Sequence, residues 1–151
     1  MKRHFLKYFL AGWLAFSMLT GAKAQVGLCP NNLDFEQGDF SNWICRAGGA
    51  GGPYPLPLTG PIAGRHTIID RLTAGTDPFG FFPEICPNGS NYSLKLGNHQ
   101  TGAQAESISY TYAIPAGLSN FSMLFFYAVV IESPGHIPAN QPRFRARIID
   151  I

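Results

Sequence analysis

The feature that most constrains this chain is the stretch 106–131, whose sequence predicts two β-strands joined by a turn. Apolar and polar side chains alternate over 106–114, which is the period-2 pattern of a half-buried strand. Pro115 and Gly117 then supply turn chemistry. Residues 123–131 are apolar throughout, too few to cross a membrane as a helix, and their β-branched and aromatic content favours a central strand covered on both faces. We therefore expect a sheet built around this hairpin.

Residues 1–24 have the pattern of a secretory signal peptide. A basic front end is followed by an apolar core at 9–19 and a small-x-small motif, with the predicted cut between Ala24 and Gln25. An N-terminal membrane anchor is the disfavoured alternative, because the apolar core is short and a cleavage motif follows it. We therefore expect a protein that is secreted or held at the outer cell surface, with no membrane span after the signal is removed.

Removing the signal peptide changes the charge balance of the chain. The whole sequence has 11 basic and 9 acidic residues, and removing the four basic residues of the signal leaves 7 against 9, so +2 becomes −2. No basic patch remains that would indicate nucleic-acid binding. Residues 25–151 are long enough for one small domain, are rich in glycine, proline and phenylalanine, and contain no helix-period segment. This composition predicts an all-β sandwich with long loops.

The domain is expected to contain about six strands, against the eight or so of a complete jelly roll. The predicted strands lie near residues 33–36, 65–72, 92–97, 106–114, 121–132 and 143–150. Residues 46–64 are predicted to form a flexible or extended loop, since no Lys-Ser/Thr follows these glycines to make a phosphate loop. The sequence stops at Ile151 inside the last predicted strand, so we expect the domain to be incomplete there and to fold poorly alone.

The most specific motif is residues 32–43, which follow the pattern Asn-x-x-Phe-Glu-x-Gly-x-Phe-x-x-Trp. This motif resembles the opening strand of jelly-roll modules of the carbohydrate-binding-module and MAM-like kinds, and so implies a jelly-roll-like β-sandwich. In many such modules acidic groups near this strand help to hold a structural calcium ion, so the resemblance implies Ca²⁺ at Asp34 and Glu36. Ordinary solvent-exposed acids are the alternative, because a calcium site needs about six oxygen ligands.

Further motifs occur in a fixed order: SLKLGN at 93–98, AESISY at 105–110, YAVVI at 127–131, and NQPRF at 140–144 after His136. Together they resemble the N-terminal jelly-roll-like domain of large secreted proteins of gliding Bacteroidetes. Those proteins carry PKD-type repeats and a C-terminal gliding-motility-associated sorting domain that type IX secretion reads. The resemblance covers most of the chain after the signal peptide and implies downstream domains of the same chain as partners. It implies no known reaction.

Catalytic motifs are missing from the sequence, which contains no His-Glu-x-x-His, Gly-x-Ser-x-Gly, Cys-x-x-Cys or phosphate loop. His66, His99 and His136 lie in separate segments whose spacings match no metal-ligand pattern. Glu106 and Glu132 stand at the two ends of the predicted hairpin, where a pair of carboxylates could serve glycoside hydrolysis. We favour solvation at the strand ends or pairing with arginine, and therefore expect no enzyme.

Five aromatic residues in or beside the long loops are candidate ligand contacts: Trp43, Tyr54, Phe79, Phe81 and Phe82. Their ring faces could stack on sugar rings while burying apolar area. The favoured alternative is that these side chains plug the open end of the sandwich, as a small sandwich requires.

A polar group of candidate contacts follows the hairpin: His136, Gln141 and Arg143. These side chains could hold a ligand or a neighbouring domain, since loops often carry function. The favoured alternative is that Gln141 bonds the backbone of its own proline-rich loop and that His136 is exposed.

An exported chain meets oxidising conditions, so its three cysteines should not all stay free. We prefer a Cys45–Cys86 bridge over Cys29–Cys45, because Cys45 and Cys86 both precede glycine-bearing loops beside strands. The remaining thiol would then pair with a cysteine beyond Ile151.

Two functions follow from these observations. The leading hypothesis is a non-enzymatic adhesion or glycan-contact module at the N-terminus of a multidomain cell-surface or secreted protein, with a glycan or another extracellular surface as partner. The alternative is an accessory carbohydrate-binding module of a secreted polysaccharide-degrading enzyme.

Overall fold

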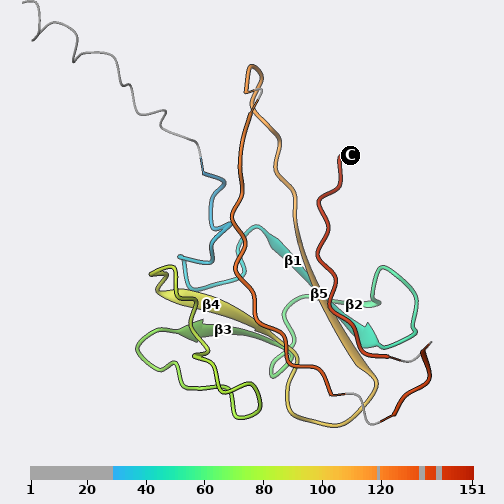
Figure 1. Ribbon diagram of the computed structural model, residues 1–151. Helices are drawn as coiled ribbons and strands as arrows, with labels where there is room; N and C mark the ends of the chain where they lie inside the picture. Colours follow the sequence, from blue (N-terminus) through green and yellow to red (C-terminus); the bar gives the residue numbers. More distant parts are fainter. Residues whose placement is uncertain (1–28, 119, 133–134, 139–140) are drawn as a thin grey trace, which may run out of the picture.

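Figure 1 shows the computed structural model of the chain, which is all-β, as the sequence predicted. The structure describes residues 29–118, 120–132, 135–138 and 141–151. The predicted signal peptide and its cleavage site therefore lie outside the described residues. Within the described part of the chain, no helix is long and apolar enough to cross a membrane.

Within the described residues, five strands form two antiparallel sheets. In the first sheet, β1 (Trp43–Gly49) lies between β2 (Leu58–Thr59) and β5 (Gln104–Tyr110). The second sheet pairs β3 (His66–Asp70) with β4 (Tyr92–Leu96) over their full lengths. Strands β3, β4 and β5 confirm three of the predicted strands, although β5 ends at Tyr110 and not at residue 114.

Strand β1 supplies the most buried part of the first sheet, although the sequence predicted a loop from residue 46 onward. Cys45 and Ala47 point inward from alternate positions and are almost completely buried. At Gly48 an added Cβ would lie 2.9 Å from Pro57 Cδ and 3.0 Å from Leu56 Cδ2. The prediction was wrong because this glycine does not loosen the chain; it lets the following loop lie directly on the strand.

A largely buried ion pair joins the start of β3 to the first sheet. Arg65, the residue before β3, places its Nε 2.6 Å from Oε1 of Glu106 on β5, and both side chains are only 15% and 11% exposed. The Nη2 group of Arg65 also donates to the carbonyl oxygens of Gly48 and Ala105, at 2.8 and 2.9 Å. The arginine therefore ties the start of β3 to β5 and to β1 at once.

The predicted strand at 33–36 was wrong, because this part of the chain forms consecutive turns. Phe35 has a φ of 64°, which no β-strand residue adopts. The side-chain amide of Asn32, only 5% exposed, donates to oxygens of Asp39 and Ser41 at 3.0–3.1 Å. This amide replaces ladder hydrogen bonds with local ones, which is how asparagine competes with a strand.

The predicted strands at 121–132 and 143–150 were also wrong. Both segments run as extended chain beyond β5, drawn in orange and red in Figure 1, yet neither pairs into a sheet within the described residues. The central strand expected at 123–131 is not covered: Leu124, for example, is 80% exposed. A strand is defined by its hydrogen-bonded neighbours as much as by its own residues, and no described residue pairs with either segment in a sheet.

Candidate functional site

The aromatic loop, defined here as residues 76–83, is closed by its own backbone. Thr76 and Pro83 form an antiparallel bridge at its base. Inside the loop the Asp77 amide donates to the Phe82 carbonyl at 2.9 Å, and the Phe81 amide donates to the Asp77 carbonyl at 3.0 Å. These bonds fix a loop that lies between β3 and β4 in the sequence.

Asp77 organises the loop from within. Its side chain is buried, and its Oδ1 accepts hydrogen bonds from the backbone amides of Gly80, at 2.7 Å, and Phe79, at 3.0 Å. These two bonds lower the pKa of Asp77 against the opposing effect of burial, and the positive charge of Lys95 adds to them. The ionised carboxylate is therefore the form that holds the loop in shape.

A lysine and a glutamate support the base of the loop. Nζ of Lys95 on β4 lies 2.6 Å from Oε1 of Glu84 and 3.9 Å from Oδ2 of Asp77. The Glu84 amide donates to the Gly75 carbonyl at 3.0 Å. The Lys95 hydrogen bond lowers the pKa of Glu84, so this carboxylate is also held ionised. The aromatic loop is thus attached to a regular strand by charge.

Two rings of the loop face solvent. Phe81 is 81% exposed and has a φ of 56°, and Phe79 is 61% exposed. The Phe79 ring lies near the His99 ring, with centroids 5.6 Å apart. A bulky residue at positive φ is strained and persists only where its surroundings hold it, a state often found at binding sites. The loop therefore presents apolar ring faces on a fixed backbone.

Phe82 differs from its two neighbours because it is half-buried. An added Cβ at Gly80 would overlap the Phe82 ring and would lie 2.9 Å from Cγ2 of Val130. Only glycine therefore fits under this ring, and the favoured interpretation of the phenylalanines as plugs applies to Phe82. It does not describe the exposed rings of Phe79 and Phe81.

Trp43 is half-buried and packs against other rings. The Phe35 ring stacks on it at a centroid distance of 4.6 Å, and the Tyr110 ring meets it edge-on at 5.1 Å. Its Nε1 donates to the Asn32 carbonyl at 2.8 Å. The structure therefore gives Trp43 a role in packing the turns at 29–42 against the first sheet.

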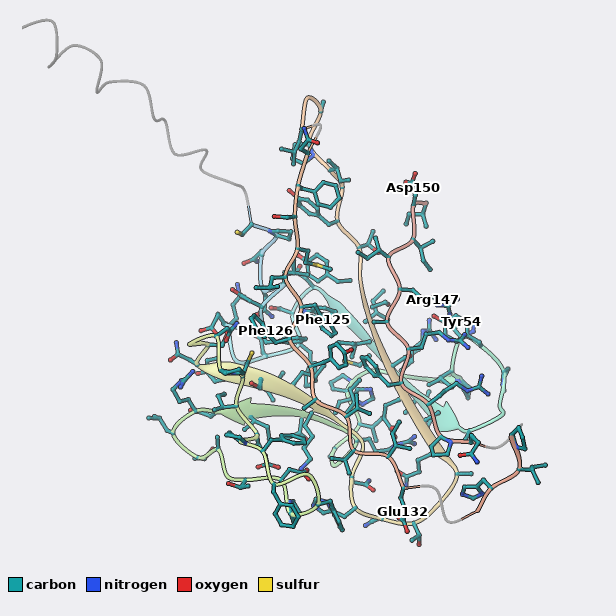
Figure 2. All side chains as sticks on the ribbon, viewed as in Figure 1. Tyr54, Phe125, Phe126, Glu132, Arg147 and Asp150 are labelled. Atoms are coloured by element: carbon teal, nitrogen blue, oxygen red, sulfur yellow. The ribbon has the colours of Figure 1, made fainter. Side chains whose placement is uncertain are left out.

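Tyr54 is 74% exposed and lies in the loop before β2. Figure 2 shows the Arg147 side chain beside it, and the guanidinium carbon lies 5.7 Å from the ring centroid. This arrangement is a cation–π contact, so one face of Tyr54 is already used within the molecule.

The polar candidates after the hairpin form a local contact. Nε2 of Gln141 donates to the His136 carbonyl at 2.6 Å, and both residues are exposed. This geometry confirms the interpretation that Gln141 bonds the backbone of its own loop. Arg143 is exposed as well, and nothing in the described residues gathers these three side chains into a cleft.

The two acids suggested for calcium are used by the protein itself. Asp34 Oδ1 accepts the Glu36 amide at 3.2 Å, while the Glu36 carboxylate accepts the backbone and side-chain N–H groups of Asn91 at 2.9 and 3.0 Å. Burial raises the pKa of Glu36, but hydrogen bonds from Ser90, Asn91 and Tyr92 outweigh it and lower the pKa. The described residues contain no group of three or more histidine, cysteine or acidic side chains placed to hold a metal. The calcium ion stays a prediction.

The structure has all three cysteines as free thiols: Cys29 exposed, Cys45 buried and Cys86 half-buried. It therefore does not contain the predicted Cys45–Cys86 bridge. Burial raises the pKa of the Cys45 thiol, which keeps it protonated and slow to react.

Several residues of the site escaped the sequence analysis, above all Asp77, Glu84 and Lys95. One signal was present for the first: an aspartate directly before Pro78 favours a turn in which the carboxylate caps following amides. No signal marked the pairing of Lys95 with Glu84, because it depends on the register of β4.

Comparisons of the chain with protein-family models, with curated proteins and with solved structures found no match.

Proposed function

We propose that this chain is a non-enzymatic extracellular module that contacts glycans, or a glycan-bearing surface, through the aromatic loop. The observation that carries the proposal is the pair of exposed rings, Phe79 and Phe81, on a loop that Asp77 and Lys95 hold in place. Such a module would serve adhesion at the head of a multidomain protein, or targeting if that protein degrades polysaccharides.

The physical case rests on rigidity and exposure together. Each exposed phenylalanine leaves apolar surface in water, and covering one contributes about 1.5–3 kcal/mol. The aromatic loop already has its backbone fixed by hydrogen bonds, so little conformational entropy is lost when a ligand arrives. Sugar rings have apolar faces of matching size, on which aromatic rings can stack.

The positions of the two carboxylates considered for glycoside hydrolysis, Glu106 and Glu132, support the proposal that the module is not an enzyme. Glu106 is ion-paired with Arg65 and largely buried, whereas Glu132 is exposed at the end of the extended segment (Figure 2). Glycoside hydrolysis needs two carboxylates flanking one bond. Only one of these two faces solvent.

Phe81→Gly tests the proposal on a glycan array. Glycine suits a φ of 56° better than phenylalanine does, so the variant removes the ring while relieving strain. We expect the free energy of unfolding to stay equal or to rise, and glycan binding to fall about tenfold or more, which corresponds to about 1.4 kcal/mol.

Leu72→Ala is the matched control, because Leu72 is 91% exposed in the turn after β3, outside the aromatic loop. It should bind like the wild type. Unchanged binding by Phe81→Gly, or no binding of the wild type to any glycan, would contradict the proposal.

A further inference from the structure

Asn88 and Gly89 form the one Asn-Gly pair in the sequence, in the turn between the aromatic loop and β4. Both residues are exposed. Gly89 has a φ of 95°, and a Cβ added to it would meet nothing within 4 Å, so water and hydroxide can reach this peptide bond. Glycine at this position therefore leaves the backbone nitrogen after Asn88 unshielded by any side chain.

The hydrogen bonds of this turn favour attack on the Asn88 side chain. Within the described residues the Gly89 amide donates no backbone hydrogen bond, so its nitrogen is open to reaction. The Ser90 amide donates to Oδ1 of Asn88 at 2.9 Å. This bond draws electrons away from Cγ and stabilises the negative oxygen that forms when a nucleophile adds there. The side-chain carbonyl is therefore activated next to an unshielded backbone nitrogen.

These features fit a ring closure that needs only water. The Gly89 amide loses its proton to hydroxide, and its nitrogen forms a bond to Cγ of Asn88. The bond from Cγ to Nδ2 then breaks, and Nδ2 takes a proton from water and leaves as ammonia, which gives a cyclic imide. Water adds to one of the two imide carbonyls and opens the ring, to aspartate or to isoaspartate. The net change replaces an amide and water by a carboxylic acid and ammonia, with no oxidation or reduction.

Asn98 lies in a similar turn but lacks these features. The Gln100 amide donates to Oδ1 of Asn98 at 2.9 Å, so the same carbonyl is activated. However, Nδ2 of Asn98 donates to the Gly64 carbonyl at 3.1 Å, and the next residue is His99, which carries a side chain beside the attacking nitrogen. We propose that the folded protein spontaneously converts Asn88, and not Asn98, to a mixture of aspartate and isoaspartate.

Isoaspartate matters to the fold because it adds a methylene group to the main chain. Asn88 lies between two anchored residues. On one side the Cys86 amide donates to Oγ of Ser93 at 2.7 Å. On the other side the backbone and side-chain N–H groups of Asn91 donate to the Glu36 carboxylate at 2.9 and 3.0 Å. A main chain lengthened between these anchors should shift Asn91 away from Glu36, the contact that joins the turns before β1 to the residue before β4.

Incubation of the purified protein without its predicted signal peptide, at mildly alkaline pH, tests the site. Peptide mapping by mass spectrometry locates the mass gain from amide to acid, and an isoaspartate methyltransferase labels the isoaspartate. We expect Asn88 to convert at least about tenfold faster than Asn98, with a rate that rises in proportion to hydroxide. Asn88→Gln should convert far more slowly, because the longer side chain must close a larger ring.

A peptide of residues 84–92 serves as the reference for the sequence alone. The folded protein should convert Asn88 at least as fast as the peptide, because the Ser90 hydrogen bond and the open Gly89 amide are already in place. Three results would overturn the proposal: no conversion at Asn88, equal rates at Asn88 and Asn98, or a folded protein clearly slower than the peptide. The last would mean that the turn holds the Asn88 carbonyl away from the Gly89 nitrogen.

Hydrogen exchange measures the structural consequence. In the isoaspartate fraction, isolated by chromatography, the Asn91 amide should exchange at least about tenfold faster than in fresh protein. Asn88→Asp is the matched control, because it carries the new charge without the extra methylene and can accept the same Ser90 hydrogen bond. It should exchange like the wild type. Unchanged protection of Asn91 in the isoaspartate fraction would contradict the expected loss of its contact with Glu36.

Discussion

Two regions of this molecule differ in whether their apolar segments form paired strands and become buried. The paired region, residues 29–110, contains all five strands and every side chain that is buried among the described residues. The extended region, 111–151 where it is described, is richer in consecutive large apolar residues and buries none of them. Hydrophobicity alone therefore did not decide where strands form. Pairing partners and anchoring polar groups did.

The polar groups show what the extended region lacks. In the paired region Arg65, Asn32 and Asp77 each satisfy several backbone groups at once and fix loops that would otherwise be long and irregular. The described contacts of the extended region include the stacked rings of Tyr127 and Phe144 and the contact of Arg147 with Tyr54. Ring stacking contributes about 0.5–1.5 kcal/mol per pair and satisfies no backbone group.

The largest expected effect is that of Arg65→Ala. Removing one member of a buried ion pair leaves the other charge without a partner, and two backbone carbonyls also lose their donor. We expect the free energy of unfolding to fall by about 3 kcal/mol, at the low end for buried pairs because both side chains keep some exposure. Urea unfolding followed by circular dichroism measures it.

Arg147→Ala is the matched control from the extended region. Its exposed cation–π contact with Tyr54 is expected to contribute below about 1 kcal/mol. Equal losses for the two arginine variants would break the distinction between the regions.

A middle-sized effect is expected within β1. Gly48→Ala forces a methyl group against Leu56 and Pro57, and overpacking of this kind costs about 1–3 kcal/mol. Gly49→Ala adds the same methyl next door, where the nearest atom is the Ala103 carbonyl oxygen at 3.4 Å, and should cost clearly less. Urea unfolding midpoints of the two variants measure which substitution destabilises the protein more. If Gly49→Ala is the more damaging, the packing of the 50–57 loop on β1 is not what requires glycine.

The strands that the sequence predicted correctly each have a recognisable strand pattern. In β4 and β5 polar and apolar side chains alternate for most of the strand, and β3 contributes the β-branched run Thr67-Ile68-Ile69. The missed strand β1 begins at Trp43 and ends in Gly48 and Gly49. Two glycines in sequence are typical of a loop, and only the structure shows that Leu56 packs on Gly48. The false strand at 121–132 had the strongest pattern of all, and a pattern cannot report whether a neighbour is present.

The candidate site was predictable in its exposed parts only. The aromatic content of residues 76–83 indicated a contact loop, and Phe79 and Phe81 are exposed there. The sequence could not separate them from Phe82, because the burial of the Phe82 ring depends on how the folded loop places it over Gly80. The contacts of Trp43 with Phe35 and Tyr110 could not be predicted either, because they depend on how the turns at 29–42 fold onto β1 and β5.

The smallest expected effect is a dependence on acid that the paired region should show through Glu84. The Lys95 hydrogen bond lowers the folded-state pKa of Glu84 below its usual 4.5, so the stabilisation is fully present above about pH 4.5 and is lost as the pH falls through the lower folded value. Glu84→Gln should therefore be less stable than the wild type at pH 7, by under about 1 kcal/mol, and should converge with it in acid. Thermal unfolding between pH 7 and about pH 2.5 measures both profiles.

Glu132→Gln removes an exposed carboxylate of the extended region and should follow the wild type throughout. A gap between Glu84→Gln and the wild type that stays constant down to the lowest pH would mean that the amide disturbs packing and that the charge of Glu84 does not stabilise the aromatic loop.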